Sequence, residues 1–300
     1  MSIKNVALIG GTGTLGAPVL KGLKESSFNV SVLNRQSSKS NYPDVNVITV
    51  PDDLDVSKVT ELFKQNSIDA LVITIAGSRV TEQKKLIEAA LNAGVQRVFP
   101  ADFGSCDSAD DKTNEVLPLM AGKKSVRDYL ISLEGKGKLT WTSLITAHFF
   151  DWGFSNLLLK FDVKARKAYI IDGGDIKFSG SNLDFIAEAV VRVLQRPEET
   201  ANKLLYVHSH HVTQNEILSV LEKVTGTKWE KIHESSEEQL RKARPKMLEG
   251  DHDAGEEVVA VWGIVAADWS DRKGFANDLL GLKTLDLEET VRRAVEKVDA

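Results

Sequence analysis

The segment "LPLMAGKKSVRDYL", residues 117–130, places two adjacent lysines in a stretch with helical spacing. In a helix of about 3.6 residues per turn, Lys123 and Lys124 point about 100° apart, so only one can face a given ligand. A tyrosine four residues before a lysine would put a phenol and an ammonium on one helical face and allow a proton relay. None of the four tyrosines has a lysine four residues later. The segment therefore predicts chemistry that uses a cation without a neighbouring phenol.

A second chemical feature is the glycine-rich stretch "VALIGGTGTLGAPVL", which joins an apolar run to a helix-like pattern. Gly10, Gly13 and Gly16 would permit a tight turn, close approach of a diphosphate and close helix–strand packing. Gly11, Gly13 and Gly16 also satisfy the G-x-G-x-x-G spacing. The N-terminus of the following helix offers unpaired N–H groups and a positive dipole end to phosphates. A dinucleotide is expected here, with contacts from Gly10, Thr12, Gly13, Thr14, Leu15 and Gly16.

The residues that end the second apolar run indicate which dinucleotide is bound. An NAD site usually has an acidic residue about twenty positions after the glycines, which accepts hydrogen bonds from the ribose hydroxyls. This chain has "VLNRQSSKS" there, with a neutral Asn34 and no acidic residue. Arg35 offers a guanidinium fork, and Ser37 and Lys39 can add donors to a phosphate dianion. The segment favours NADP(H), and a solvated polar loop is the alternative.

Apolar runs rich in β-branched residues alternate with amphipathic stretches through the first half of the chain. This alternation predicts an α/β fold, a Rossmann-type doubly wound parallel sheet with helices on both faces. Ligands bind at the carboxyl ends of such strands, so the cofactor is also expected to contact Ala76, Gly77, Pro100 and Phe103. The predicted strands are 6–10, 30–34, 45–50, 70–77, 95–101 and 139–145, and the predicted helices include 81–94 and 117–130.

After about residue 150 the alternation becomes less regular. A short hairpin is expected around Gly173 and Gly174, and "KLLYVHS" is a further predicted strand. We therefore expect two domains, an NADP-binding Rossmann domain over 1–155 and a smaller α/β substrate-binding lobe over 156–300. Some elements of the smaller lobe are expected to return to the main sheet.

Aromatic residues follow the sixth predicted strand in "AHFFDWGF" and would form a wall beside the nicotinamide. A histidine there could exchange a proton near neutral pH, although a lone histidine among aromatic residues is more often structural. Trp262 and Trp269 could close the pocket from the smaller lobe, and ordinary core packing is their alternative. The expected substrate contacts are Asp102, Phe103, His148, Phe149, Phe150, Trp152 and Trp262.

Composition and charge argue against several classes of protein. A hydrophobic content of 42% and a charged content of 27% are ordinary for a globular chain, and the net charge of −5 disfavours nucleic acid and anionic lipid as partners. The single Cys106 cannot form an internal disulfide, which suits a reducing compartment. The apolar run before the first glycines is too short for a signal peptide, so a cytoplasmic protein is expected. "HSHH", residues 208–211, lacks a cysteine or carboxylate partner, and no metal site is expected.

Taken in order, five segments resemble those of the NmrA-like and isoflavone reductase-like family, the atypical short-chain dehydrogenases. They are "GGTGTLG", "NRQSSKS", "AGVQRVFPADFG", "GKKSVR" and the C-terminal "LLGLKTLDLEETVRR". The resemblance spans nearly the whole chain and implies a reductase that uses NADPH on aromatic or conjugated small molecules. It also implies that Lys123, at the family's lysine position, is catalytic and lies at the cofactor. Plant reductases of the family have a Ser-Glu pair where this chain has Ala101-Asp102, which bears on the substrate class.

These residues support a specific kind of reaction. Hydride transfer needs the donor and acceptor carbons held close and aligned, and charge that develops on the acceptor must be stabilised. Lys123 could stabilise that charge, or protonate the product through water. The expected function is NADPH-dependent reduction of a conjugated double bond or imine in secondary metabolism, and a homodimer is the expected assembly. The alternatives are an NADP-binding redox sensor that regulates another protein, and a non-redox cyclase or isomerase on the same fold.

Overall fold

The structure is a computed structural model that describes residues 2–299. The chain forms two compact units, and each unit is assembled from three separate segments. Unit 1 contains the residues up to Asp102 together with Ala121–Leu144 and Ile186–Leu205. Unit 2 contains Phe103–Met120, Ile145–Phe185 and the residues from Tyr206 onward. This division differs from the expected boundary at residue 155, because the chain passes between the units several times.

Unit 1 is built on a seven-stranded sheet in the order β11-β6-β5-β4-β1-β2-β3. The neighbouring pairs from β6 to β3 are parallel, so the predicted Rossmann-type sheet is confirmed. A later segment, β11, extends the sheet beside β6. The strands are β1 (Asn5–Ile9), β2 (Asn29–Arg35), β3 (Asn46–Val50), β4 (Ala70–Ile73), β5 (Arg97–Phe99), β6 (Thr140–Ile145) and β11 (Lys203–Tyr206).

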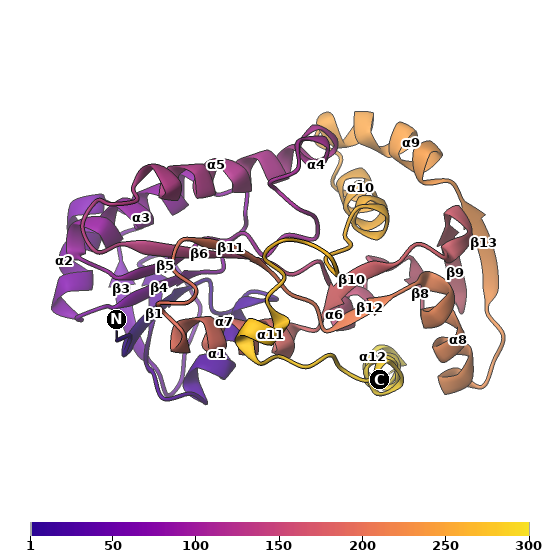
Figure 1. The fold of residues 1–300 in the computed structure, drawn as a ribbon, viewed down its shortest axis with the longest axis horizontal. Helices are drawn as coiled ribbons and strands as arrows, with labels where there is room; N and C mark the ends of the chain where they lie inside the picture. The colour runs from indigo at the N-terminus through magenta and orange to yellow at the C-terminus, as the bar shows by residue number, and fades with distance from the viewer. Residues whose placement is uncertain (1, 300) are drawn as a thin grey trace. The chain divides into compact units, whose positions relative to one another are not determined.

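Helices cover both faces of this sheet (Figure 1). On one face lie α2 (Val56–Gln65), α3 (Val80–Ala93) and α5 (Pro118–Ser132), and on the other lie α1 (Gly16–Lys24) and α7 (Leu183–Gln195). The central strands β1 and β4 consist almost entirely of buried residues, as expected for a sheet covered on both faces. Aliphatic side chains from the sheet pack with Phe63 and Trp141 in one continuous core.

Unit 2 contains two three-stranded sheets, in the orders β12-β10-β7 and β13-β9-β8. Its own core gathers Phe150, Phe154, Phe161, Phe178 and Trp229. The strands are β7 (His148–Phe149), β8 (Phe161–Asp162), β9 (Lys167–Ile171), β10 (Phe178–Ser181), β12 (His210–Val212) and β13 (Glu230–Glu234). The helices are α4 (Asp111–Val116), α6 (Phe150–Gly153), α8 (Gln214–Thr225), α9 (Ser236–Leu248), α10 (His252–Val265), α11 (Asn277–Leu280), α12 (Leu287–Asp299) and the 3-10 turn η1 (Asp172–Gly174).

The hairpin predicted around Gly173 and Gly174 is wrong. The two strands flank this turn, but β9 pairs with β8 and β13, whereas β10 pairs with β7 and β12. Both glycines have positive φ, at 86° and 81°, and the turn sends the chain from one sheet to the other. Pairing with distant strands therefore overrides the local turn signal.

Across residues 2–299, no helix has the length and apolar character that crossing a bilayer requires.

Arg97 is a fully buried cation that joins three segments of unit 1. Its guanidinium donates hydrogen bonds to the hydroxyls of Thr140 (2.9 Å), Thr142 (2.8 Å) and Thr200 (2.9 Å), and to the carbonyl of Pro197. Burial lowers the pKa of Arg97 to about 10. The guanidinium thus links β5 and β6 to the turn that follows α7.

Replacing Arg97 by methionine is expected to lower the free energy of unfolding by about 2 kcal/mol, because a buried carbonyl and three hydroxyls lose a donor. Urea denaturation followed by circular dichroism measures the change. The matched control is Arg192→Met on α7, which removes an exposed pair with Glu188 (2.9 Å) and should change stability by only about 0.5 kcal/mol. Equal effects of the two substitutions would contradict this reading.

Candidate functional site

The turn between β1 and α1 can be formed only with glycine at two positions. Gly10 has φ +91°, and its carbonyl accepts a hydrogen bond from the N–H of Gly13 at 3.0 Å. A Cβ on Gly16 would lie 1.9 Å from the Gly10 carbonyl oxygen, which is far inside contact distance. A Cβ on Gly10 would lie 2.8 Å from the backbone of Thr74. The glycines therefore allow the start of α1 to pack closely against the carboxyl ends of β1 and β4.

The first turn of α1 presents its backbone N–H groups without competition from side chains. Leu15 occupies the N-cap, and among the described residues no side chain caps this end and no acidic residue stands in the first turn. Lys21 and Lys24 lie in the last turn, where a cation interacts favourably with the helix dipole. A helix N-terminus of this kind accepts an anionic group such as a diphosphate.

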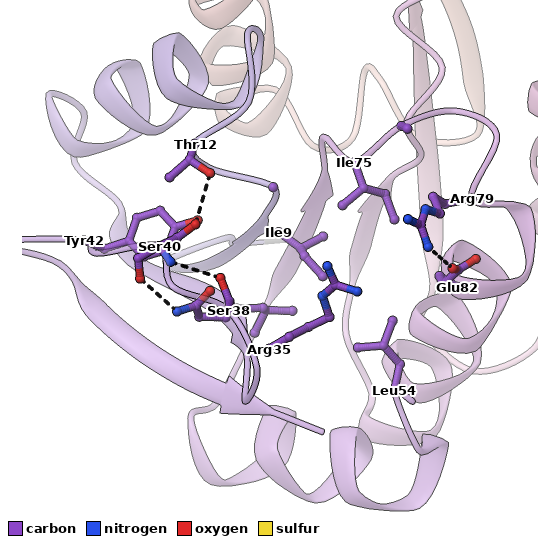
Figure 2. A pocket seen from close by; sticks show the side chains of 14 residues that line it. Ile9, Thr12, Arg35, Ser38, Ser40, Tyr42, Leu54, Ile75, Arg79 and Glu82 are labelled. Carbon is purple, nitrogen blue, oxygen red and sulfur yellow. Dashed lines mark hydrogen bonds and ion pairs between the residues drawn. The ribbon is translucent and has the colours of Figure 1, made fainter. Parts of the chain in front are cut away.

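A pocket of about 290 Å³ opens beside this turn, at the carboxyl ends of β1, β2 and β4 (Figure 2). Apolar side chains of Ile9, Leu33, Leu54 and Ile75 form part of its wall. Of the predicted cofactor contacts, the pocket is lined by Gly10, Thr12, Arg35 and Ala76. It is also lined by residues that were not predicted, namely Ser38, Ser40, Tyr42 and Arg79.

Two guanidinium groups reach this pocket from different elements. Arg35 ends β2, and Arg79 stands at the N-cap of α3 (Figure 2). Arg79 pairs with Glu82 at 2.9 Å, and this hydrogen bond is the largest cause that holds the pKa of Glu82 below its ordinary value. The charge of Arg35 lowers the pKa of Glu82 further. Sequence reasoning missed Arg79, although its place just after the fourth strand, at the edge where ligands bind, could have indicated it.

The loop after β2 is arranged differently from its prediction. Ser37 donates its hydroxyl (2.5 Å) and its N–H (3.1 Å) to Asp52, and these bonds lower the pKa of that carboxyl. Ser37 and Lys39 are not among the residues that line the pocket, whereas Ser38 and Ser40 are. An acidic residue therefore stands near the loop after all, because the segment after β3 supplies it.

The two lysines of α5 lie in different surroundings. Lys124 is partly exposed and pairs with Asp128 at 2.7 Å. Lys123 donates a hydrogen bond from its ammonium to the backbone carbonyl of Asp102. Its stem runs across Gly77, where an added Cβ would lie 2.7 Å from Lys123 Cε. A side chain at position 77 would displace the Lys123 stem from this path.

The carboxylate of Asp102 is bound by other side chains of unit 1. Its side chain is 1% exposed, and Oδ2 lies 2.6 Å from Arg127 Nη1 and 2.5 Å from Ser143 Oγ. The carboxylate that was predicted to contact substrate thus forms an internal ion pair. Pro100 and Phe103 are also buried, and neither lines the pocket beside the glycine turn.

Several predicted substrate residues are core residues of unit 2. His148 is fully buried, its Nε2 lies 3.2 Å from the carbonyl of Ala260, and a Cβ on Gly263 would lie 2.1 Å from that nitrogen. Phe150 and Trp269 have no exposed surface. These three side chains fill interior space, so the structure does not place them in a wall open to a ligand.

Other predicted substrate residues keep exposed surface. Phe149 is half-buried and meets Trp152 edge to face, with ring centroids 6.4 Å apart. Trp262 is partly buried and donates from its indole N–H to the Thr113 hydroxyl at 3.0 Å. Trp152 lines a second pocket, of about 460 Å³, wholly within unit 2. The lining of that pocket combines Trp152, Leu157, Leu158 and Val259 with the carboxylates Asp253, Glu256 and Glu257.

The histidines of "HSHH" are arranged by packing. His208 accepts or donates a hydrogen bond with Ser179 at 2.9 Å and stacks on His211, with ring centroids 5.5 Å apart. The His210 ring packs on the Phe150 ring, with ring centroids 4.4 Å apart. Among residues 2–299, the side chains that bring three potential metal ligands together are instead His252, Asp253 and Glu256, all exposed.

The buried histidines predict acid sensitivity. Burial lowers the pKa of His148, and also of His208 and His210, to about 4 from 6.5. The unfolded chain therefore binds more protons than the folded chain between these values, so stability is complete above about pH 6.5 and is lost as the pH falls toward 4. For His148 alone, the free energy of unfolding should fall by about 2 kcal/mol between pH 7 and pH 5.

Urea denaturation of the wild type and of His148→Asn at both pH values isolates this contribution. The variant should lose less stability than the wild type on acidification. His252→Asn is the matched control for loss of an imidazole, since His252 is exposed. An unchanged pH dependence in His148→Asn would show that the neutral imidazole is not the cause.

Comparison with known proteins agrees with the motifs. The family model of the NmrA-like family matches residues 2–258. The oxidoreductase aprR of Aspergillus flavus is 32% identical over 298 residues, which cover 97% of this chain and 98% of the relative. An isoflavone reductase homolog of Solanum tuberosum is 27% identical over 79% of each chain.

Solved structures share the fold over nearly the whole chain. The binary complex of leucoanthocyanidin reductase and NADPH from Vitis vinifera has a TM-score of 0.79 at 18% identity, covering 97% of this chain and 99% of that one. AtPrR2 with NADP+ and (+)pinoresinol has a TM-score of 0.79 at 20% identity, with 98% and 99% covered. With its glycine turn, its parallel sheet and the matched family model, the chain belongs to the NmrA-like family, as the resemblance of its motifs predicted.

Proposed function

We propose that this protein is an NADPH-dependent reductase that transfers hydride to a small aromatic or conjugated molecule. The observation that carries the proposal is the pocket beside the glycine turn, where Arg35 and Arg79 converge on the carboxyl ends of the strands. Its relatives named oxidoreductase and isoflavone reductase homolog support a redox reaction. A role in secondary metabolism, a cytoplasmic location and a homodimer belong to the same proposal.

The residues of the pocket fit NADPH in particular. The first turn of α1 would receive the diphosphate, and the guanidiniums of Arg35 and Arg79 would bind the additional phosphate of NADPH. Ser38 and Ser40 add hydroxyls to the lining of the pocket. Asp52 stands near this loop, but its carboxylate is already engaged by Ser37. When bound, NADPH supplies the hydride, and two structural neighbours of this fold were solved with NADP+ or NADPH.

Lys123 would act on the acceptor. Its ammonium can stabilise negative charge that develops on an enolate or phenolate oxygen, or protonate the product through a water molecule. Neither role needs a neighbouring phenol. The conjugated double bond or imine expected from the sequence suits this cation, because hydride addition leaves negative charge on another atom, the oxygen of an enone or the nitrogen of an imine.

The second pocket, within unit 2, has a lining that would favour some small molecules over others. An indole and aliphatic side chains suit an aromatic or conjugated ring. Asp253 and Glu256 place carboxylates around that apolar surface, and the third carboxylate, Glu257, pairs with Lys160 at 2.7 Å. Negatively charged ligands would be repelled there, and neutral or cationic ones favoured. The structural neighbour that was solved with pinoresinol supports an aromatic substrate class.

Phosphate recognition by the two arginines can be tested directly. Arg35→Ala and Arg79→Ala should each raise the Kd for NADPH roughly 10-fold or more, because a charge-assisted hydrogen bond is lost, while the Kd for NADH changes little. Titration calorimetry measures both affinities. Lys39→Ala is the matched control, since Lys39 follows the same strand but does not line the pocket. A preference for NADH in the wild type would contradict the cofactor assignment.

The reaction itself is tested by incubating the protein with NADPH and a panel of conjugated aromatic ketones, imines and benzylic ethers. Loss of NADPH absorbance and formation of a reduced product are expected, and Lys123→Met should lower kcat by about 100-fold without preventing NADPH binding. Equal affinity for NADP+ and NADPH with no turnover would indicate a redox sensor. Product formed equally well without NADPH would indicate a cyclase or isomerase.

A further inference from the structure

Both the backbone carbonyl and the side-chain carboxylate of Asp102 bind side chains of α5. Its backbone carbonyl accepts the ammonium of Lys123, and its carboxylate pairs with Arg127 at 2.6 Å. Lys123 and Arg127 are four residues apart on α5, so they lie on one face of that helix. A single residue after β5 therefore binds two cations of α5 that lie one helical turn apart.

The carboxylate end of this arrangement is buried and well paired. The side chains of Arg127 and Asp102 are 5% and 1% exposed, and Ser143 on β6 adds a hydrogen bond of 2.5 Å to the same oxygen. Removing one partner of such a buried pair leaves an uncompensated charge, so the pair has little freedom to rearrange. The side chain of Asp102 is thus held from α5 and from β6 together.

The backbone on either side of the Lys123 stem is also restrained. Gln83 on α3 is 1% exposed, and its Oε1 accepts the N–H of Ala101 at 2.9 Å. Its amide lies 3.5 Å from the carbonyl of Gly77, the residue that the lysine stem crosses. The Asp102 carbonyl, which accepts the hydrogen bond from Lys123, consequently belongs to a loop whose backbone is restrained by hydrogen bonds on both sides of the lysine stem.

We propose that Asp102 is a positioning residue for Lys123. Its ion pair with Arg127 and Ser143 fixes the peptide whose carbonyl directs the lysine ammonium, and this inference rests on the proposed function of Lys123 at the acceptor. A lysine has a long, flexible stem, so a fixed acceptor for its ammonium limits where the charge can stand. A displacement of about 1 Å in such a group can lower a rate by about 100-fold.

The first experiment measures Lys123 without any substrate. Wild type, Ser143→Ala and Asp102→Asn are treated with a lysine-acetylating reagent, and mass spectrometry gives the labelling rate of Lys123 relative to the exposed Lys21. Both substitutions should raise this ratio, by about fivefold for one hydrogen bond lost. Ser143→Ala removes only a hydroxyl, so it remains a test should Asp102→Asn fold poorly.

The matched control is Asp128→Asn, which removes a carboxylate from an exposed pair with Lys124 on the same helix. It should leave the Lys123 ratio unchanged. Wild-type ratios in folded Ser143→Ala and Asp102→Asn would overturn the proposal, and so would an equal rise in Asp128→Asn.

Steady-state kinetics supply the second measurement. Ser143→Ala should lower kcat by about 10-fold while KM for NADPH stays within about twofold, because only the placement of the lysine changes. Unchanged kcat together with an unchanged labelling ratio would overturn the proposal. A raised labelling ratio in a protein that needs no Lys123 for turnover would support the positioning and refute the proposed function of the lysine.

Discussion

The approach of the Gly16 backbone to the Gly10 carbonyl is the constraint on which the nucleotide side of unit 1 depends. A single methyl group there would lie 1.9 Å from the oxygen, so α1 could not begin where it does. Because α1 begins directly above the end of β1, its first turn faces the same edge of the sheet as the ends of β2 and β4. Arg35, Arg79 and the serines of the β2 loop come together at that edge.

A similar close contact governs the lysine side of unit 1. Gly77 lets the Lys123 stem pass against the backbone, and the ion pair of Asp102 and Arg127 holds the loop that receives the ammonium. In both places a missing side chain makes room and a network of hydrogen bonds keeps that room. Close approach to the backbone therefore decides where α1 begins and where the Lys123 stem runs.

The sequence predicted most of the sheet of unit 1, because buried parallel strands and the glycine turn depend on local patterns. It did not predict that Arg79 lines the pocket or that Asp52 bonds the loop after β2. Each residue comes from another element, and only tertiary packing brings it to its place. His148 and Phe150 were expected to contact substrate and are buried instead, since an aromatic run looks alike in a core and in a pocket. The β9–β10 hairpin failed because pairing with distant strands overrode the turn.

The addition of β11 to the main sheet has a consequence for synthesis of the chain. Residues of β11 and α7 emerge from the ribosome long after β6, and unit 2 segments lie between them in the sequence. Each unit includes segments that are synthesised late. The edge of β6 that pairs with β11 therefore stays unpaired while the intervening segment of unit 2 is translated. Such late closure of distant segments slows folding and lengthens the time in which an unpaired strand edge is available to other chains.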